Sequence, residues 1–185
     1  MSSFIDVRLE TPRLQLRPLV DTDAEALMAL YADERVARYL SRPAWTSLDQ
    51  ARASITRAQA GLEAGEGLRL AVLQQGQARV IGDVVLFDFV PQCRRAEMGY
   101  ALAADHQGHG YMREALTALL DHAFTALDLN RIEADIDPRN AASARILERL
   151  GFQREGLLRE RWIVAGEVSD TALYGLIRSD WHPGG

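Results

Sequence analysis

The sequence predicts an α/β protein with one mixed, mostly antiparallel sheet of about six or seven strands, flanked by about four helices. Its 185 residues fit one domain, residues 1–185. Segments with the two-residue period of a strand alternate with segments that have the period of a helix. One strand–helix–strand unit lies between hairpins. We therefore expect one parallel pair in an otherwise antiparallel sheet.

The N-terminal third contains one strand and two helices. Residues 13–17 alternate apolar and polar side chains, which predicts a strand. Asp21 or Thr22 is a suitable N-cap for a helix over residues 24–31. A capping-box pattern opens a second helix over residues 47–62, and glycines follow it.

The middle of the chain contains three strands and the strongest helix signal. Residues 68–73 and 80–90 read as a hairpin whose turn includes Gln75 and Gly76. A further strand covers residues 96–103. Apolar side chains then recur at three- and four-residue steps over residues 112–127, which is the stripe of an amphipathic helix.

The C-terminal third alternates strands with one more helix. We expect a short strand over residues 131–136 and then a helix over residues 140–150, with Asn140 as its N-cap. Two closing strands, over residues 152–164 and 168–177, form a second hairpin. The complete pattern is seven strands and four helices.

Composition and charge narrow the functional classes. The net charge of −5 argues against a nucleic-acid partner, because such domains are usually basic. No apolar stretch approaches the ~18 residues of a membrane span, and the N-terminus lacks a signal-peptide pattern. Cys93 is the only cysteine, and no histidine–carboxylate set has metal-site spacing. We expect a cytoplasmic protein with no metal, no nucleic acid and no membrane partner.

Residues 107–112 form a polar, glycine-bearing segment at the start of the long helix. Free backbone N–H groups and the helix dipole favour an anion there, and glycines allow a phosphate close approach. Arg113 occupies the place of the third glycine of a dinucleotide fingerprint, and no Gly-Lys-Ser/Thr follows. Two glycines at a helix start are weak evidence for a phosphate site, so the segment taken alone favours an ordinary strand-to-helix turn.

Several short motifs recur in a specific order along the chain. They are Ala-Glu-Met-Gly-Tyr at 96–100, Gln-x-x-Gly at 107–110, Asp-Pro-Arg-Asn at 137–140 and Leu-Gly-Phe at 150–152. With these motifs the sequence resembles the GNAT superfamily, and specifically the RimJ/RimL-like branch, which acetylates protein N-termini. The resemblance extends from about Glu10 to Trp181. It implies the GNAT fold, in which two parallel strands splay apart.

The resemblance also implies acetyl-CoA as the bound cofactor. The pantetheine arm would lie in the split, and the pyrophosphate would lie on the glycine-bearing turn. The implied cofactor-binding residues are Tyr100, Ala101, Leu102, Gln107, Gly108, His109, Gly110, Tyr111, Met112, Arg113, Asn140 and Ser143. Met112 departs from the family pattern, which usually has a small residue at this sixth position.

Two residues are candidates for catalysis. Glu97 lies on the strand beside the expected thioester and is a candidate general base, although a salt-bridged strand residue explains it equally well. Ser143 occupies the place where this branch has a serine that is proposed as the acid. The tyrosine that many GNAT enzymes use as an acid is replaced by Leu147. Tyr100 and Tyr174 are alternative acids.

The acceptor is expected to bind between the N-terminal helices and the last hairpin. Tyr39, Trp45, Glu97 and Trp162 are the candidate substrate-binding residues, although core packing explains the aromatic ones almost as well. A protein N-terminal α-amine is the favoured acceptor. The alternatives are a small amine, such as a polyamine, an amino acid or an aminoglycoside, and a non-catalytic acyl-CoA-binding role. A homodimer is compatible with the sequence.

Overall fold

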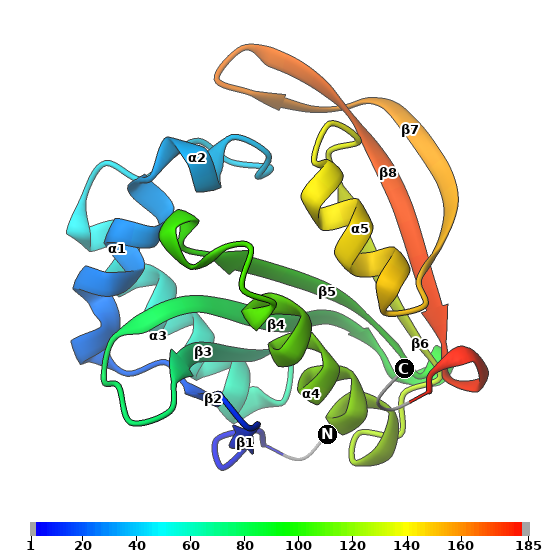
Figure 1. The fold of residues 1–185 in the computed structure, drawn as a ribbon, viewed down its shortest axis with the longest axis horizontal. Helices are drawn as coiled ribbons and strands as arrows, with labels where there is room; N and C mark the ends of the chain where they lie inside the picture. The colour runs from blue at the N-terminus through cyan, green and yellow to red at the C-terminus, as the bar shows by residue number, and fades with distance from the viewer. Residues whose placement is uncertain (1–2, 183–185) are drawn as a thin grey trace.

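A computed structural model describes residues 3–182 of the chain. It contains one eight-stranded sheet with the strand order β1-β2-β3-β4-β5-β6-β8-β7 (Figure 1). The strands are β1 (Leu9–Glu10), β2 (Leu14–Pro18), β3 (Leu68–Gln74), β4 (Val80–Val90), β5 (Arg95–Leu102), β6 (Arg131–Ile136), β7 (Gln153–Val164) and β8 (Glu167–Ile177). The helices are α1 (Ala24–Ala32), α2 (Glu34–Ala37), α3 (Leu48–Ala64), α4 (Tyr111–Thr125) and α5 (Ala141–Arg149).

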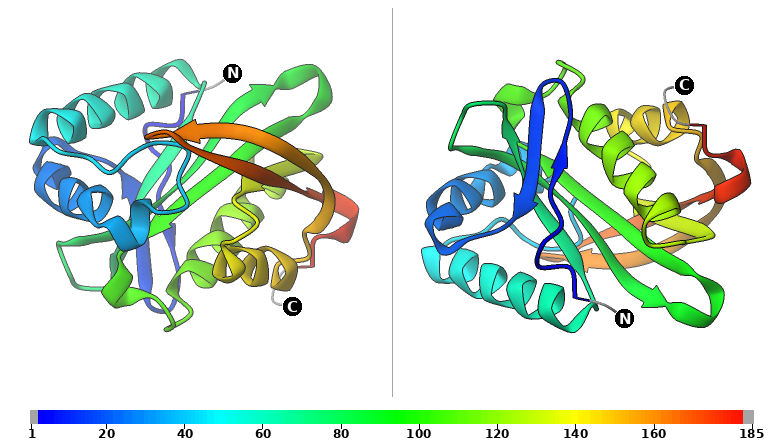
Figure 2. Two further views of the ribbon diagram at one scale, coloured as in Figure 1. Left: turned by 90° about the horizontal axis from the view of Figure 1, so that it is seen from above. Right: turned by 90° about the horizontal axis from the view of Figure 1, so that it is seen from below.

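Helices cover both faces of the sheet (Figure 2). Leucines of α4 pack with apolar side chains of the central strands and of α5 in the larger core cluster. Side chains of α1 and α3 form the second cluster on the opposite face. The period of each element explains this arrangement, because each helix buries one stripe and each strand alternates between the two cores.

The only parallel pair in the described sheet is the feature that positions the site. β5 and β6 are in register at just three positions, Arg95↔Arg131, Ala96↔Ile132 and Glu97↔Glu133. β5 stays paired with β4 as far as Leu102, and β6 stays paired with β8 as far as Ile136. The sheet therefore splits beyond Glu97, as the family resemblance implied.

The predicted fold class is confirmed, with differences at the level of single elements. β1 and the four-residue helix α2 were not predicted. The predicted cap of α1 is wrong, because residues 21–23 form a 3-10 turn and Asp23 is the N-cap. The carboxylate of Asp23 accepts hydrogen bonds from the Val20 amide and the Arg17 guanidinium.

The observed start of α3 matches the predicted capping box. α3 begins after Ser47, whose amide donates to the Gln50 side chain at 3.0 Å, and it ends at Gly65, whose φ is +69°. Gly61 lies inside α3 and does not end it. Within residues 3–182, no helix has the length and apolar content that crossing a membrane requires.

Candidate active site

The glycine-bearing turn forms an open cradle of backbone amides at the start of α4. Gly108 and Gly110 have φ values of +81° and +78°, a left-handed conformation that favours glycine. Gly110 is the N-cap of α4. Within the described chain, none of the amides of residues 108–113 donates to a protein acceptor. These amides face solvent at a helix N-terminus, which fits the pyrophosphate of CoA.

The segment from Thr11 to Arg13, which we call the strap, is hydrogen-bonded to this turn and to the first turn of α4. The Glu114 carboxylate accepts hydrogen bonds from the Thr11 hydroxyl at 2.5 Å and from the Arg13 amide at 2.9 Å. The Arg13 guanidinium also contacts Glu114, donates to the His109 carbonyl at 2.9 Å and lies 4.7 Å from the ring centre of Tyr111. Burial alone would raise the pKa of Glu114, but the hydrogen bonds from Thr11 and Arg13 outweigh it and lower the pKa.

Side chains at both ends of the turn are anchored to the sheet. Gln107 donates to the Leu102 carbonyl at 3.0 Å, at the end of β5. The hydroxyl of Tyr111 accepts a hydrogen bond from Gln74 on β3 at 2.8 Å. Met112 is 3% exposed and packs in the larger core, so the bulky side chain at this unusual position points away from the cradle. Only its backbone is available to a ligand.

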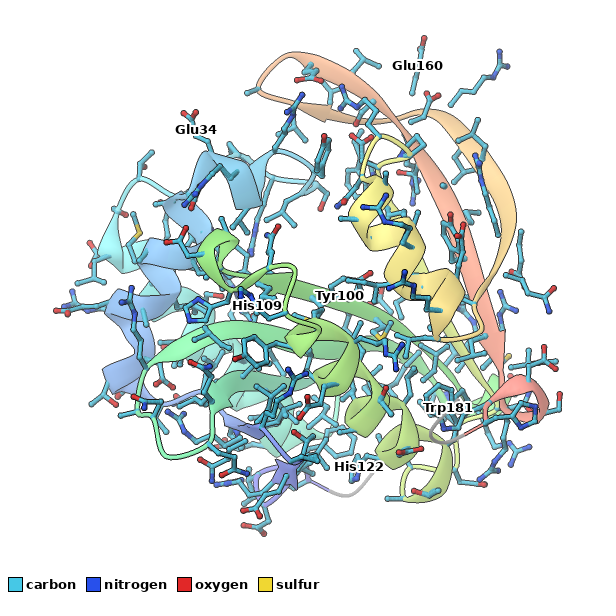
Figure 3. The ribbon with its side chains drawn as sticks, in the orientation of Figure 1. Glu34, Tyr100, His109, His122, Glu160 and Trp181 are labelled. Carbon is cyan, nitrogen blue, oxygen red and sulfur yellow. The ribbon has the colours of Figure 1, made fainter. Side chains whose placement is uncertain are left out.

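A hydroxyl pair bridges the split between β5 and α5. The Tyr100 hydroxyl lies 2.6 Å from the Ser143 Oγ, and the labelled Tyr100 lies between β5 and α5 in Figure 3. The Ser143 amide donates to the Asn140 side chain at 3.1 Å, so Asn140 caps α5 as predicted. Burial raises the pKa of Tyr100 to about 12, against a smaller opposing effect of its bond to Ser143. Both hydroxyls are therefore protonated at neutral pH and can pass a proton between them.

Glu97 is the last residue of β5 that is in register with β6, and the split begins after it. In-register residues of neighbouring strands share a face, so Glu97, Glu133 and Asp135 lie on one side of the sheet. Burial, followed by the negative charges of Asp135 and Asp88, raises the pKa of Glu97. A carboxylate with a raised pKa at the start of the split has the basicity that a general base needs.

A cleft of about 790 Å³ opens beside the split. It is bordered by α2 and the loop after it, by β5 and β6, and by the β7–β8 hairpin, which reaches toward α2 in Figure 1. Gly99, Tyr100 and Ser143 line this cleft, as do Tyr39 and Trp162. The structure therefore brings together the predicted acid, the free edge of β5 and two of the predicted aromatic residues.

Glu97 does not line this cleft, and neither does Trp45. Trp45 is 6% exposed, and its ring centre lies 4.6 Å from that of Tyr31 in the second core. Tyr174, an alternative acid, is also a core residue. Large aromatic side chains next to helices are most often buried, and the sequence pattern does not separate core packing from cleft lining.

Asp135, Arg42 and Thr171 line the cleft and were not predicted. Asp135 had a usable signal, because Glu133 and Asp135 alternate with apolar residues along β6 and must share a face. Thr171 becomes a neighbour only through the pairing of β6 with β8. Arg42 lies in the loop after α2, where no periodic pattern predicts which residues face the cleft.

Comparisons with known proteins agree with this geometry. A family model described as an acetyltransferase (GNAT) domain matches residues 13–153. The chain is 34% identical to the uncharacterized N-acetyltransferase p20 of Bacillus licheniformis, over 94% of this chain and 97% of that protein. It is 30% identical to the [ribosomal protein uS5]-alanine N-acetyltransferase of Escherichia coli, over 99% of this chain and 97% of that protein.

Two solved structures share the fold of this chain and are each 25% identical to it in sequence. The ribosomal-protein-S5-alanine acetyltransferase of Vibrio fischeri has a TM-score of 0.83 and 25% identity, covering 96% of this chain and 100% of that one. The spermidine N-acetyltransferase of Vibrio cholerae, solved with CoA and spermine, has a TM-score of 0.81 and 25% identity, covering 92% of this chain and 98% of that one.

Proposed function

The chain belongs to the GNAT family of acetyl-CoA-dependent N-acetyltransferases, and from this premise we propose that its acceptor is the α-amine at a protein or peptide N-terminus. The observation that carries the proposal is the open cleft at the split, which Tyr100, Ser143 and the free edge of β5 border together. The similarity to an N-terminal alanine acetyltransferase over nearly the whole chain supports it.

The charge of the cleft supports a peptide acceptor over a polyamine. Four carboxylates line it, Glu34, Asp135, Asp137 and Glu167, and four guanidinium groups line it as well. A site built for a polycation needs an excess of negative charge, because potentials across a binding interface are complementary. A cleft with both signs suits the start of a peptide, where amine, carbonyl and amide groups follow one another.

In this proposal the donor is held mainly by backbone groups. The amides of residues 108–113 would bind the pyrophosphate, and the free edge of β5 from Met98 to Leu102 would pair with the pantetheine arm. Acetyl-CoA supplies an activated thioester, so no covalent enzyme intermediate is needed. An N–H on this edge would donate to the carbonyl oxygen as that oxygen gains charge.

The side chains at the split have separate proton-transfer roles. An α-amine has a pKa of about 7.7–8.0, so a base is useful at neutral pH. Glu97 would accept the amine proton, directly or through water, as the nitrogen bonds to the acetyl carbon and the carbon–sulfur bond breaks. Ser143 would donate a proton to the departing sulfur and regain one from the Tyr100 hydroxyl, which would in turn take a proton from solvent in the open cleft.

The proposal is tested by acetyl transfer to matched amines. The protein is incubated with acetyl-CoA and either a peptide with a free N-terminus, the same peptide blocked at its N-terminus but carrying an internal lysine, or spermidine. Thiol release and peptide mass are followed. We expect acetylation of the free N-terminus alone. Acetylation of spermidine only would overturn the acceptor, and CoA binding without acetylation of any amine would indicate a non-catalytic role.

A further inference from the structure

A second cavity, of about 490 Å³, lies beside the cleft, between α3 and the face of the sheet. It shares Arg42 and Phe87 with the cleft, so the two spaces adjoin. Three arginines line it, Arg42, Arg57 and Arg69, and none of its lining residues is a carboxylate. We call this space the arginine pocket.

The floor of the arginine pocket is a buried ion pair. Arg69 contacts Asp83, donates to the Ser54 hydroxyl at 2.6 Å and donates to the Tyr31 hydroxyl at 3.3 Å. Tyr31 in turn lies 2.7 Å from the Asp83 carboxylate. The charge of Arg69 is therefore balanced by Asp83. The floor provides a rigid polar surface rather than a free positive charge.

The positive charge of the pocket belongs to Arg42 and Arg57. Neither forms an ion pair or a side-chain hydrogen bond within residues 3–182. The guanidinium of Arg42 lies 4.3 Å from the ring centre of Tyr31 and 5.0 Å from that of Trp45, which fixes its position. Arg57 is exposed and Arg42 is half-buried, and two arginines without a carboxylate partner in the described chain favour an anion in this pocket.

Strand register sets the distance from this pocket to the split. Arg69 is in register with Val85, and Val85 is in register with Gly99 on β5. The three residues form one row across the sheet, two strand spacings long, or about 10 Å. An extended peptide advances about 3.3 Å per residue, so it covers this distance within its first few residues.

We propose that the arginine pocket binds an anionic group of the acceptor, carried by an acidic side chain at about the second to fourth residue of the peptide. The proposal rests on the acceptor function proposed above. Arg57 and Arg42 bind the carboxylate while the α-amine reaches Glu97 and the split. A small aminocarboxylate with its two ends about 10 Å apart has the same chemistry.

The test compares peptides that differ only at one early residue. Glutamate, glutamine or lysine is placed at the third residue, with parallel series at the second and fourth, and kcat/KM for acetyl transfer is measured. We expect roughly tenfold preference for glutamate over glutamine at the best position. Arg57→Gln should reduce this ratio to about one, and Arg57→Glu should favour lysine. A linear ω-aminocarboxylate is tested as a second acceptor. If its kcat/KM falls in Arg57→Gln as that of the glutamate peptide does, the anionic group can also come from a small molecule.

Arg52→Gln is the matched control, because Arg52 is exposed on the same helix and pairs with Asp49 outside the pocket. This variant should keep the preference for glutamate. Fluorescence anisotropy measures the binding of labelled, already acetylated peptides that carry glutamate or glutamine at this position. It therefore reports the preference for glutamate without turnover. Equal kcat/KM for glutamate and glutamine at every position, in a protein that acetylates both, would overturn the anionic site. Failure to acetylate any peptide would instead overturn the proposed acceptor.

Discussion

The hydroxyls of Tyr100 and Ser143 lie 2.6 Å apart, and the mechanism proposed above gives them the proton transfer to the departing sulfur. Ser143→Ala removes the hydroxyl proposed to protonate the thiolate, and we expect kcat to fall about 100-fold. Tyr100→Phe leaves Ser143 in place without its partner, so a smaller loss of roughly tenfold is expected. Stopped-flow detection of thiol release measures both.

Ser41→Ala is the control for this pair, since Ser41 lines the same cleft and is exposed. It should leave kcat unchanged. If Ser143→Ala raises KM for acetyl-CoA and leaves kcat alone, Ser143 binds the donor and does not act as its acid.

In the proposed mechanism, the environment of Glu97 sets the acidic limb of the pH profile. Burial and then Asp135 raise its pKa, so the acidic limb of the rate profile begins at a higher pH than for an ordinary carboxyl group. Asp135→Asn removes the negative charge that raises the pKa of Glu97 most and should move this limb to lower pH. Glu97→Gln should abolish the limb and leave only the titration of the amine.

The profile of kcat/KM against pH, with one peptide and saturating acetyl-CoA, measures both effects. Glu63→Gln, on the exposed surface of α3, provides the comparison and should leave the profile unchanged. An unchanged profile in Glu97→Gln would remove the base role from Glu97.

At the scale of elements, we expect the contacts of Thr11 and Arg13, between β1 and β2, with Glu114 of α4 to keep the amide cradle in shape. Glu114→Gln weakens the hydrogen bonds to Thr11 and Arg13, and we expect a loss of stability of about 1 kcal/mol and weaker CoA binding. The lowered pKa of Glu114 means that its contribution is present above its unfolded pKa and is lost as pH falls through the folded pKa. Calorimetry of CoA binding and of thermal unfolding measures the two losses.

Glu25→Gln in α1 provides the comparison, because Glu25 is exposed and α1 packs on the opposite face of the sheet from α4. It should change neither quantity. Unaltered CoA affinity in Glu114→Gln would show that the cradle keeps its shape without the strap.

Local features of the site can be predicted from the sequence, and contacts between distant residues cannot. The turn was predictable because its glycines and the stripe of α4 are local signals, and both depend on residues within a few positions of each other. The strap was not, since Thr11 and Glu114 are 103 residues apart and meet only through the sheet. The contact between Tyr100 and Ser143 spans 43 residues and depends on the split between two strands. The arginine pocket likewise depends on the register of β3, β4 and β5.

At the scale of the whole molecule, the described sheet consists of two parts joined by a short seam. Strands β1–β5 form one part and β6, β8 and β7 form the other, and three register pairs between β5 and β6 connect them as strands. A CoA molecule in the split would contact both parts. It should therefore stabilise the junction more than the interior of either part.

Hydrogen exchange measures this coupling directly. Added CoA should slow exchange at residues 98–102 of β5, at residues 108–113 of the turn and at residues 134–136 of β6. The interior pairing of β2 with β3, far from the split, should change little. At a CoA concentration of 100 Kd the native state gains ~2.7 kcal/mol, which raises Tm by about 5–10 °C. Protection confined to the turn, with residues 98–102 and 134–136 unchanged, would show that the donor binds without entering the split, because amides that pair with or pack against a ligand exchange more slowly.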